Sequence, residues 1–164
     1  MRALILAAGL GTRLRPLTDV RAKAAVPVNG EPLVRRVISW LVSQRLDDLV
    51  VNLHHCPASI SAVVGDGQDL GARVRYSWEN PVLGSAGGPR HALPLLVDRR
   101  GRRRGPRAES AFVIVNGDTL TDVRIAEMIE AHTKSGALVT MALIRNPRPD
   151  RYGGVLVSHD RVCG

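Results

Sequence analysis

The stretch L-A-A-G-L-G-T-R-L-R-P, residues 6–16, follows a short apolar run that begins at Ala3. Two glycines separated by one residue, directly after a buried strand, allow backbone N–H groups to approach an anion closely. Arg13 and Lys23 add two side-chain cations to the same region. The pattern therefore predicts a phosphate-binding loop, and an ordinary glycine-containing turn is the alternative.

Two common phosphate-binding motifs are excluded by the residues that follow. The dinucleotide-binding fingerprint requires a third glycine, but this chain has Leu14 at that place. The P-loop requires Gly-Lys-Ser/Thr, whereas T-R-L follows Gly11 here. Pro16 also prevents a long helix directly after the loop. A phosphate would therefore be held by the loop itself together with cationic side chains.

The composition is typical of one globular domain with a buried sheet. The chain has 164 residues, of which 45% are apolar and only 3% are aromatic. The core must therefore consist of Leu, Val, Ile and Ala, which suits a parallel sheet covered by helices. No apolar run approaches the ~20 residues of a membrane span, and the first residues lead into a strand instead of a signal sequence. We expect a cytoplasmic protein without a membrane partner.

The positive charge is concentrated in one tract. The net charge is +8, and six arginines lie between residues 99 and 107, so the rest of the chain carries +2. The tract has no interleaved aromatic residues on which bases could stack. We interpret it as a basic loop inserted at about residues 98–109 and do not expect a nucleic-acid partner. DNA binding through this tract is the alternative, and its affinity would fall steeply with salt.

Apolar segments alternate between the periods of strands and helices. The helix expected from residue 125 has Ile125, Met128, Ile129 and His132 on one face. Alternating strands and helices imply βαβ crossovers. The sequence predicts an α/β fold, a Rossmann-like three-layer sandwich with a mostly parallel central sheet flanked by helices, in a single domain over residues 1–164. The expected strands lie at residues 3–8, 49–53, 73–77, 111–115, 138–144 and 155–157, and the other helices at residues 31–45, 57–64 and 89–97.

Three polar loops each follow an expected strand. They are the glycine loop at residues 9–16, a second glycine-rich loop at residues 79–88, and the N-G-D sequence at residues 116–118. In open parallel sheets, ligands bind outside the carboxyl ends of the strands. We therefore expect the three loops to converge on one edge of the sheet.

With these motifs, the chain resembles the sugar-1-phosphate nucleotidyltransferases, which make nucleotide sugars from sugar 1-phosphates and nucleoside triphosphates. The L-A-A-G-x-G-T-R-L-x-P-L-T run at residues 6–18 matches the signature of that family. The motifs look most like those of mannose-1-phosphate guanylyltransferases, and related uridylyl- and thymidylyltransferases share most of them. The resemblance implies transfer of a nucleotidyl group, with GTP and mannose 1-phosphate as the first choice. Further matches are V-N at 51–52, Y-S-W-E at 76–79, L-G-S-A-G-G at 83–88, N-G-D at 116–118 and Y-G-G-V at 152–155.

The resemblance also implies roles for individual residues. Arg13, Lys23 and Asp118 would be catalytic, Asp118 would bind the Mg²⁺ cofactor, and Gly153 would lie beside the sugar. As a hydrogen-bond acceptor, Glu79 could receive the N1–H and amino groups of guanine, which favours GTP weakly over UTP. The residues implied in nucleotide binding are Leu6, Ala7, Ala8, Gly9, Gly11, Thr12, Arg13, Glu79, Gly84 and Asn116.

Among the departures from the family pattern, two concern the site. The family's Pro-Lys-Pro is Ala22-Lys23-Ala24 here, so the loop lacks the stiffness that prolines provide. Family members continue well past this length, with a Glu near the sugar, a further Lys and a second Mg²⁺-binding Asp that cannot be located here. We therefore expect a C-terminally truncated protein that binds nucleoside triphosphate with Mg²⁺ but turns over poorly. A catalytically silent nucleotide-binding homologue is the alternative, and homo-oligomerisation stays open.

Overall fold

A computed structural model describes residues 1–97, 111–151 and 153–164 of the chain. The chain divides into two compact units, Met1–Arg124 and Ile125–Gly164. The tract predicted as a basic loop lies outside the described residues. Among the helices that the structure describes, none has the combination of length and apolar character that crossing a membrane requires.

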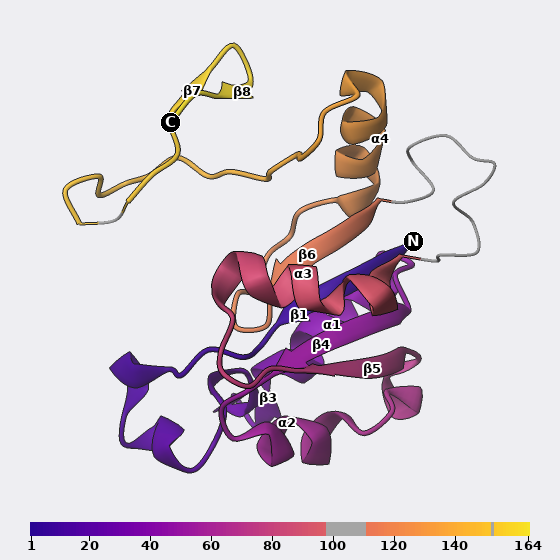
Figure 1. Ribbon diagram of the computed structural model, residues 1–164, viewed down its shortest axis with the longest axis vertical. Helices are drawn as coiled ribbons and strands as arrows, with labels where there is room; N and C mark the ends of the chain where they lie inside the picture. Colours follow the sequence, from indigo (N-terminus) through magenta and orange to yellow (C-terminus); the bar gives the residue numbers. More distant parts are fainter. Residues whose placement is uncertain (98–110, 152) are drawn as a thin grey trace. The chain divides into compact units, whose positions relative to one another are not determined.

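The first unit contains a parallel four-stranded sheet in the order β5-β4-β1-β6 (Figure 1). The predicted α/β class with a parallel central sheet is therefore confirmed. The chain proceeds from β1 outward to β5 and then returns to the other side of β1 with β6, so the direction of winding reverses between β1 and β6. Open α/β sheets bind ligands at such a reversal. The strands are β1 (Arg2–Leu6), β4 (Asp48–Leu53), β5 (Arg73–Trp78) and β6 (Phe112–Asn116).

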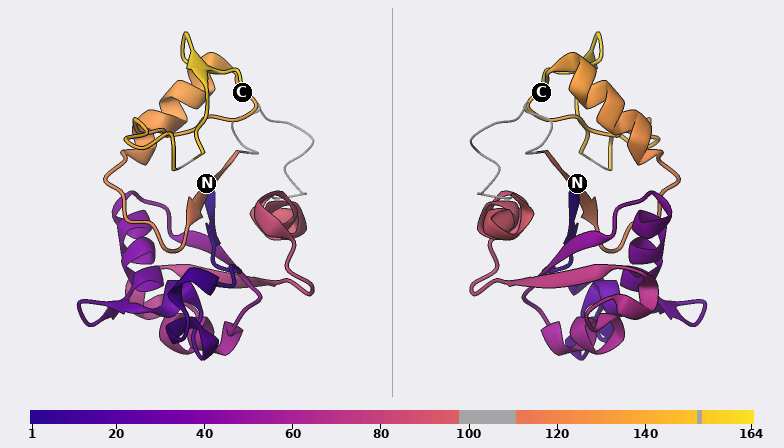
Figure 2. Two further views of the ribbon diagram at one scale, coloured as in Figure 1. Left: turned by 90° about the vertical axis from the view of Figure 1, so that its left-hand side faces the viewer. Right: turned by 90° about the vertical axis from the view of Figure 1, so that its right-hand side faces the viewer.

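Helices cover both faces of this sheet (Figure 2). Leu4 of β1 and Val50 of β4 are fully buried against Ala92 and Leu96 of α3 on one face. On the other face lies α1, an amphipathic helix whose apolar side is buried, and α2 packs beside it. The flanked sheet is thus held by aliphatic side chains, as the composition predicted. The helices are α1 (Leu33–Ser43), α2 (Pro57–Val64) and α3 (Gly84–Leu96).

Short elements connect β1 to α1. Within the described residues 9–32 no long helix follows the glycine loop, as expected from the presence of Pro16. Three single-turn 3-10 helices are followed by a two-stranded hairpin. Asn29 and Gly30 at the hairpin tip have φ values of 51° and 80°, the left-handed conformation that a two-residue turn requires. These elements are η1 (Thr12–Leu14), η2 (Leu17–Asp19), η3 (Lys23–Ala25), β2 (Pro27–Val28) and β3 (Glu31–Pro32); η4 (Gln68–Leu70) follows α2.

The second unit consists of α4 (Ile125–Ser135) and a small hairpin of β7 (Val157–Ser158) and β8 (Arg161–Val162). Ile125 is buried and Met128, Ile129 and His132 are half-buried, so the predicted apolar face of α4 is confirmed.

One predicted strand and one predicted helix start were wrong. Residues 138–144 do not form a strand, and Leu138 and Ile144 are about nine-tenths exposed. A strand needs a neighbour to accept its backbone hydrogen bonds, and none of the described strands pairs with this segment. The helix expected from Pro89 begins already at Gly84. Glycine propensity favours a loop there, but Gly88 is buried against Asn52 and Glu79, and this packing outweighs the local preference.

Asp48 begins β4 at the amino edge of the sheet. Its carboxylate accepts hydrogen bonds from Arg2 Nε (2.9 Å), Arg73 Nη2 (2.8 Å) and Arg75 Nη2 (2.7 Å). Burial alone would raise the pKa of Asp48, but the three arginines together outweigh burial and lower the pKa below 3.8. A carboxyl with a lowered folded-state pKa stabilises the fold above its unfolded pKa, and this stabilisation is lost as the pH falls through the folded value.

Replacing Asp48 with Asn is expected to lower the free energy of unfolding by about 2 kcal/mol at pH 7, because hydrogen bonds to a charged group are lost. The difference from wild type should shrink as the pH falls below 3.8 toward the lowered folded-state pKa, because the wild-type carboxyl becomes protonated first in the unfolded chain and then in the folded protein. Urea unfolding followed by circular dichroism at pH 7 and pH 3 measures both values. Asp69→Asn, which removes an exposed ion pair with Arg35, is the control and should cost less than about 1 kcal/mol. If the free energy of unfolding of Asp48→Asn is lower than that of wild type by the same amount at pH 7 and at pH 3, the prediction is contradicted.

Candidate active site

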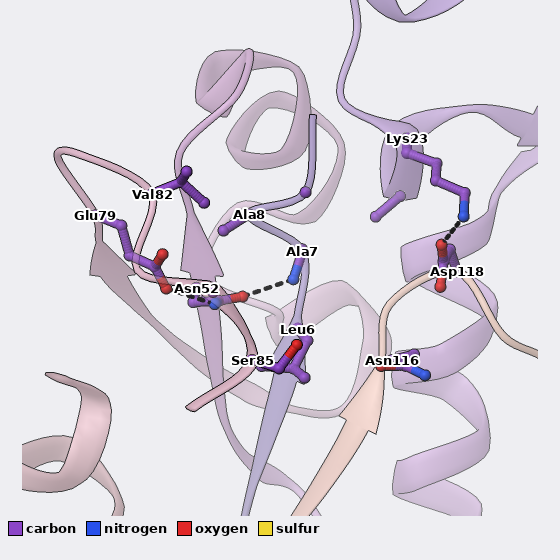
Figure 3. A pocket seen from close by; sticks show the side chains of 13 residues that line it. Leu6, Ala7, Ala8, Lys23, Asn52, Glu79, Val82, Ser85, Asn116 and Asp118 are labelled. Atoms are coloured by element: carbon purple, nitrogen blue, oxygen red, sulfur yellow. Dashed lines mark hydrogen bonds and ion pairs between the residues drawn. The ribbon is translucent and has the colours of Figure 1, made fainter. Parts of the chain in front are cut away.

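A pocket lies at the carboxyl edge of the sheet, within the first unit (Figure 3). All three loops that follow strands contribute to it, so the predicted convergence on one edge is confirmed. The pocket is lined by Leu6, Ala7, Ala8, Gly9, Lys23, Ala24, Asn52, Glu79, Val82, Gly84, Ser85, Asn116 and Asp118.

The strand register places four residues in one row across this edge. Leu6 of β1 pairs with Asn116 of β6 on one side and with Asn52 of β4 on the other, and Asn52 pairs with Ser77 of β5. Asn52 and Ser77 are polar but nearly fully buried. The strands on either side of β1 therefore end in polar residues in this row, and Leu6, Asn52 and Asn116 of the row line the pocket.

The structure brings most of the predicted site residues together. Gly11, Thr12 and Arg13 do not line the pocket, and Gly153 belongs to the second unit. The lining residues that sequence reasoning left out of the site are Ala24, Asn52, Val82 and Ser85, although the V-N and L-G-S-A-G-G motifs contain two of them. The predicted residues that line it are Leu6, Ala7, Ala8, Gly9, Lys23, Glu79, Gly84, Asn116 and Asp118.

Gly11 sets the conformation of the glycine loop. Its φ of 63° is left-handed, and a Cβ there would lie 2.9 Å from Cγ2 of Thr18. Thr18 is buried and its hydroxyl donates to the carbonyl oxygen of Gly11 (2.9 Å). Nε2 of His55 in turn donates to the carbonyl oxygen of Thr18 (2.5 Å). The loop is therefore closed on itself, and Arg13 stands on its exposed side.

Lys23 is held without the prolines of the family pattern. Ala22 and Ala24 on either side of it are buried, and the Ala22 N–H donates to Oγ of Ser59 in α2 (2.9 Å). Burial and this hydrogen bond restrain the backbone on both sides of Lys23 in place of the prolines, and the expected loss of stiffness stays a prediction.

Lys23 and Asp118 form an ion pair inside the pocket (Figure 3). Asp118 follows Gly117, whose N–H donates to the carbonyl oxygen of Leu6 (2.9 Å). A Cβ on Gly117 would lie 3.0 Å from that same oxygen. The glycine thus allows the segment after β6 to approach the end of β1, and this places the carboxylate next to the ammonium group.

Asn52 and Glu79 form a buried polar pair at the opposite side of the pocket lining. Asn52 Oδ1 accepts a hydrogen bond from the Ala7 N–H (2.6 Å), and Asn52 Nδ2 donates to Glu79 Oε1 (2.6 Å). Glu79 Oε2 accepts from the Leu83 N–H (2.9 Å). The Ala7 amide is therefore already occupied, and the amides available to an anion begin at Ala8.

The family model described as Nucleotidyl transferase matches residues 2–162 of this chain. The chain belongs to the nucleotidyl transferase family. The match spans both units and includes every lining residue of the pocket.

Individual members of the family show how far the likeness extends. The chain is 31% identical to a UTP–glucose-1-phosphate uridylyltransferase from Synechocystis and 31% identical to a mannose-1-phosphate guanylyltransferase from Mycobacterium tuberculosis. Each alignment covers 98% of this chain and 42% of the relative, so the chain spans less than half the length of these two proteins. A putative glucose-1-phosphate thymidylyltransferase from Bacillus anthracis has the same fold, with a TM-score of 0.74, 20% identity, and coverage of 99% of this chain and 62% of that one.

The donors in the pocket fit a Mg²⁺ ion of the kind expected in this family. Mg²⁺ prefers hard oxygen ligands and takes most of them from phosphates and water, so one or two carboxylates suffice. Asp118 supplies such a carboxylate, whereas both oxygens of Glu79 accept hydrogen bonds from the protein. Within the described parts of the chain, no group of three His, Cys, Asp or Glu residues could enclose a metal. The pocket therefore suits a metal that arrives with a phosphate ligand.

Proposed function

We propose that this protein transfers a nucleotidyl group from a nucleoside triphosphate to a sugar 1-phosphate and releases pyrophosphate. The observation that supports this most is that one pocket combines Lys23, Asp118 and the glycine-loop backbone at Ala8 and Gly9. A cation, a carboxylate and closely approachable amides are the groups that a metal-bound triphosphate requires. The relatives from Synechocystis and Mycobacterium tuberculosis are both named for this class of reaction.

In the proposed reaction, an oxygen of the sugar phosphate attacks the α-phosphorus in line. A new O–P bond forms while the bond from the α-phosphorus to the bridging oxygen of the β-phosphate breaks, and pyrophosphate leaves. Both reactants are already anions, so no general base is needed, but their mutual repulsion must be offset. Lys23 would contact the α-phosphate and the sugar phosphate, and Arg13 would add a second cation near the triphosphate. Mg²⁺ bound at Asp118 would supply further positive charge.

Base recognition would fall to the segment between β5 and the first turn of α3. Val82, Gly84 and Ser85 of this segment line the pocket, and backbone groups there can hydrogen-bond to guanine or to uracil. GTP with mannose 1-phosphate is our first choice because of the Y-S-W-E and L-G-S-A-G-G motifs. UTP or dTTP is the alternative, which the equal identity to the Synechocystis uridylyltransferase supports. Gly153 is the proposed sugar contact.

A substrate panel tests this proposal. Pyrophosphate release should be measured with Mg²⁺ for GTP, UTP, dTTP and ATP, each with mannose, glucose and N-acetylglucosamine 1-phosphates. The protein should be used both as the 164-residue chain and in the length that its gene encodes. We expect pyrophosphate only when both substrates are present, and fastest with GTP and mannose 1-phosphate. Pyrophosphate release that does not depend on a sugar phosphate would contradict the proposal.

A nucleotide-binding protein without turnover is the second candidate. It is favoured by the ion pair between Lys23 and Asp118, because the ammonium group competes with a metal for this carboxylate of the pocket lining. Tight binding of a nucleoside triphosphate with no pyrophosphate release, by the protein in the length that its gene encodes, would select this candidate over the first.

A further inference from the structure

Three hydrogen bonds connect the glycine loop to the segment that precedes α3. Two of them run from the Ala7 N–H to Asn52 and from Asn52 to one carboxylate oxygen of Glu79 (Figure 3). The third runs from the Leu83 N–H to the other carboxylate oxygen. Asn52 is 3% exposed and Glu79 is 5% exposed. We call these three bonds the Asn52–Glu79 network. It links two of the loops that form the pocket, although they lie more than seventy residues apart in sequence.

The surroundings of the network leave little freedom to either side chain. A Cβ on Gly88 of α3 would lie 2.5 Å from Glu79 Oε1 and 2.8 Å from Asn52 Nδ2, so the helix backbone packs directly on the pair. The backbone of Glu79 is fixed as well, because its N–H donates to Leu53 (2.8 Å) and its carbonyl oxygen accepts from Nδ1 of His54 (3.0 Å). A buried polar pair is tolerated when it is fully hydrogen-bonded. This pair is fixed in both position and polarity.

We propose that Glu79 is a positioning residue, which orients the triphosphate-binding backbone through Asn52, and that its carboxylate does not read the base. This inference rests on the proposed nucleotide-binding function. The Ala7 N–H directly precedes the N–H groups of Ala8 and Gly9 in the chain. Fixing the orientation of the Ala7 peptide therefore orients these two N–H groups. On the other side, Leu83 immediately precedes Gly84 and Ser85, which line the base end of the pocket. One buried carboxylate therefore sets the geometry of both ends of the nucleotide site.

The polarity of the network makes each single substitution unfavourable. In Glu79→Gln, the new NH₂ group faces either the Leu83 N–H or the amide of Asn52, and flipping Asn52 only transfers the conflict to Ala7. In Asn52→Asp, the Ala7 N–H is still accepted, but two carboxylate oxygens meet where Asn52 Nδ2 and Glu79 Oε1 now lie 2.6 Å apart, and they avoid repulsion only by taking up a proton. Glu79→Gln thus loses one hydrogen bond and gains a repulsive contact, and Asn52→Asp must bind a proton that wild type does not need, at a cost in free energy.

The double variant Asn52→Asp, Glu79→Gln restores all three hydrogen bonds with reversed polarity. The aspartate introduced at position 52 would accept from the Ala7 N–H and from the NH₂ group of the glutamine introduced at position 79. The side-chain oxygen of that glutamine would accept from the Leu83 N–H. The net charge of the pair is the same as in wild type. A positioning role predicts rescue by this exchange, whereas a carboxylate that binds guanine directly would still be missing at position 79.

Two ligands distinguish these roles. Inorganic tripolyphosphate occupies only the phosphate region, whereas GTP also occupies the base region. Isothermal titration calorimetry with Mg²⁺ measures the affinity for both ligands. We expect each single variant to bind both at least about tenfold more weakly than wild type, because a misdirected loop weakens every phosphate contact. The double variant should bind both within about threefold of wild type, because its hydrogen bonds are restored.

Other outcomes overturn the proposal. If Glu79→Gln leaves tripolyphosphate binding unchanged but weakens GTP binding, and the double variant does not restore it, the carboxylate reads the base. If a single variant does not fold, the double variant alone decides between the two roles. A double variant that binds tripolyphosphate normally but GTP weakly contradicts the positioning role, and so does a double variant that does not fold. Asp48→Asn, at the far end of β4, controls for reduced stability and should bind both ligands normally. If wild type binds neither ligand, the proposed function itself fails, whereas wild-type binding with unaffected single variants overturns only the role of Glu79.

Discussion

Replacing Asp118 with Asn is expected to abolish the effect of Mg²⁺ on triphosphate binding and to lower pyrophosphate release at least about a hundredfold. The carboxylate is the group in the pocket that suits a hard cation, and an amide binds Mg²⁺ far more weakly. Electrostatic groups of this kind contribute factors of about 10²–10³ when they are removed. GTP affinity measured with Mg²⁺ and with EDTA should differ for wild type and be equal for the variant.

The ion pair adds a second part to this prediction. In EDTA, Asp118→Asn should bind GTP somewhat more tightly than wild type, because one negative charge is removed and Lys23 is released toward the phosphates. Asp122→Asn lies four residues further along and is exposed, so it is a matched control that should behave as wild type. A variant at position 118 that keeps its Mg²⁺ dependence would show that the metal is bound elsewhere.

Replacing Lys23 with Met is expected to change the affinities for two ligands in opposite directions. Triphosphate binding should weaken about 10- to 100-fold, because a charge-assisted hydrogen bond to phosphate, worth about 1.5–3 kcal/mol, is lost. Mn²⁺ binding without nucleotide should strengthen about tenfold, because the ammonium group that pairs with Asp118 is removed. Calorimetry measures the first change, and electron paramagnetic resonance of free Mn²⁺ measures the second.

The control for Lys23→Met is Lys134→Met, which removes an exposed lysine paired with Glu130 on α4. This control should leave both affinities unchanged. If Lys23→Met weakens Mn²⁺ binding as well as triphosphate binding, Lys23 does not compete with the metal for Asp118. Restoration of triphosphate binding by Lys23→Arg would indicate that positive charge, rather than the shape of the ammonium group, is required.

Local sequence patterns were sufficient where residues at the ends of an element mark its start and its stop. The helix at residues 57–64 was predicted at its observed bounds, because Pro57 suits a first turn and Gly65 ends the helix in a positive-φ conformation. The strand predicted at residues 138–144 was wrong, because a mostly apolar segment forms a strand only when a neighbouring strand is present to pair with it. Similarly, glycine propensity placed the start of α3 too late, because the preference of single residues does not include the packing of Gly88.

The sequence by itself determined the parallel α/β fold and the convergence of the strand-end loops on one edge of the sheet, where Gly9, Lys23 and Asp118 line a pocket. These follow from apolar periodicity, from the glycines and from charged residues placed directly after strands, all of which are local properties. Only the tertiary structure decided that Asn52 joins Glu79 to Ala7, and that Lys23 lies against Asp118. Both contacts depend on the strand order β5-β4-β1-β6 and its register, which bring together residues up to 95 positions apart. A hydrogen-bonded pair has no period and no fixed spacing along the chain, so no pattern in the sequence specifies it.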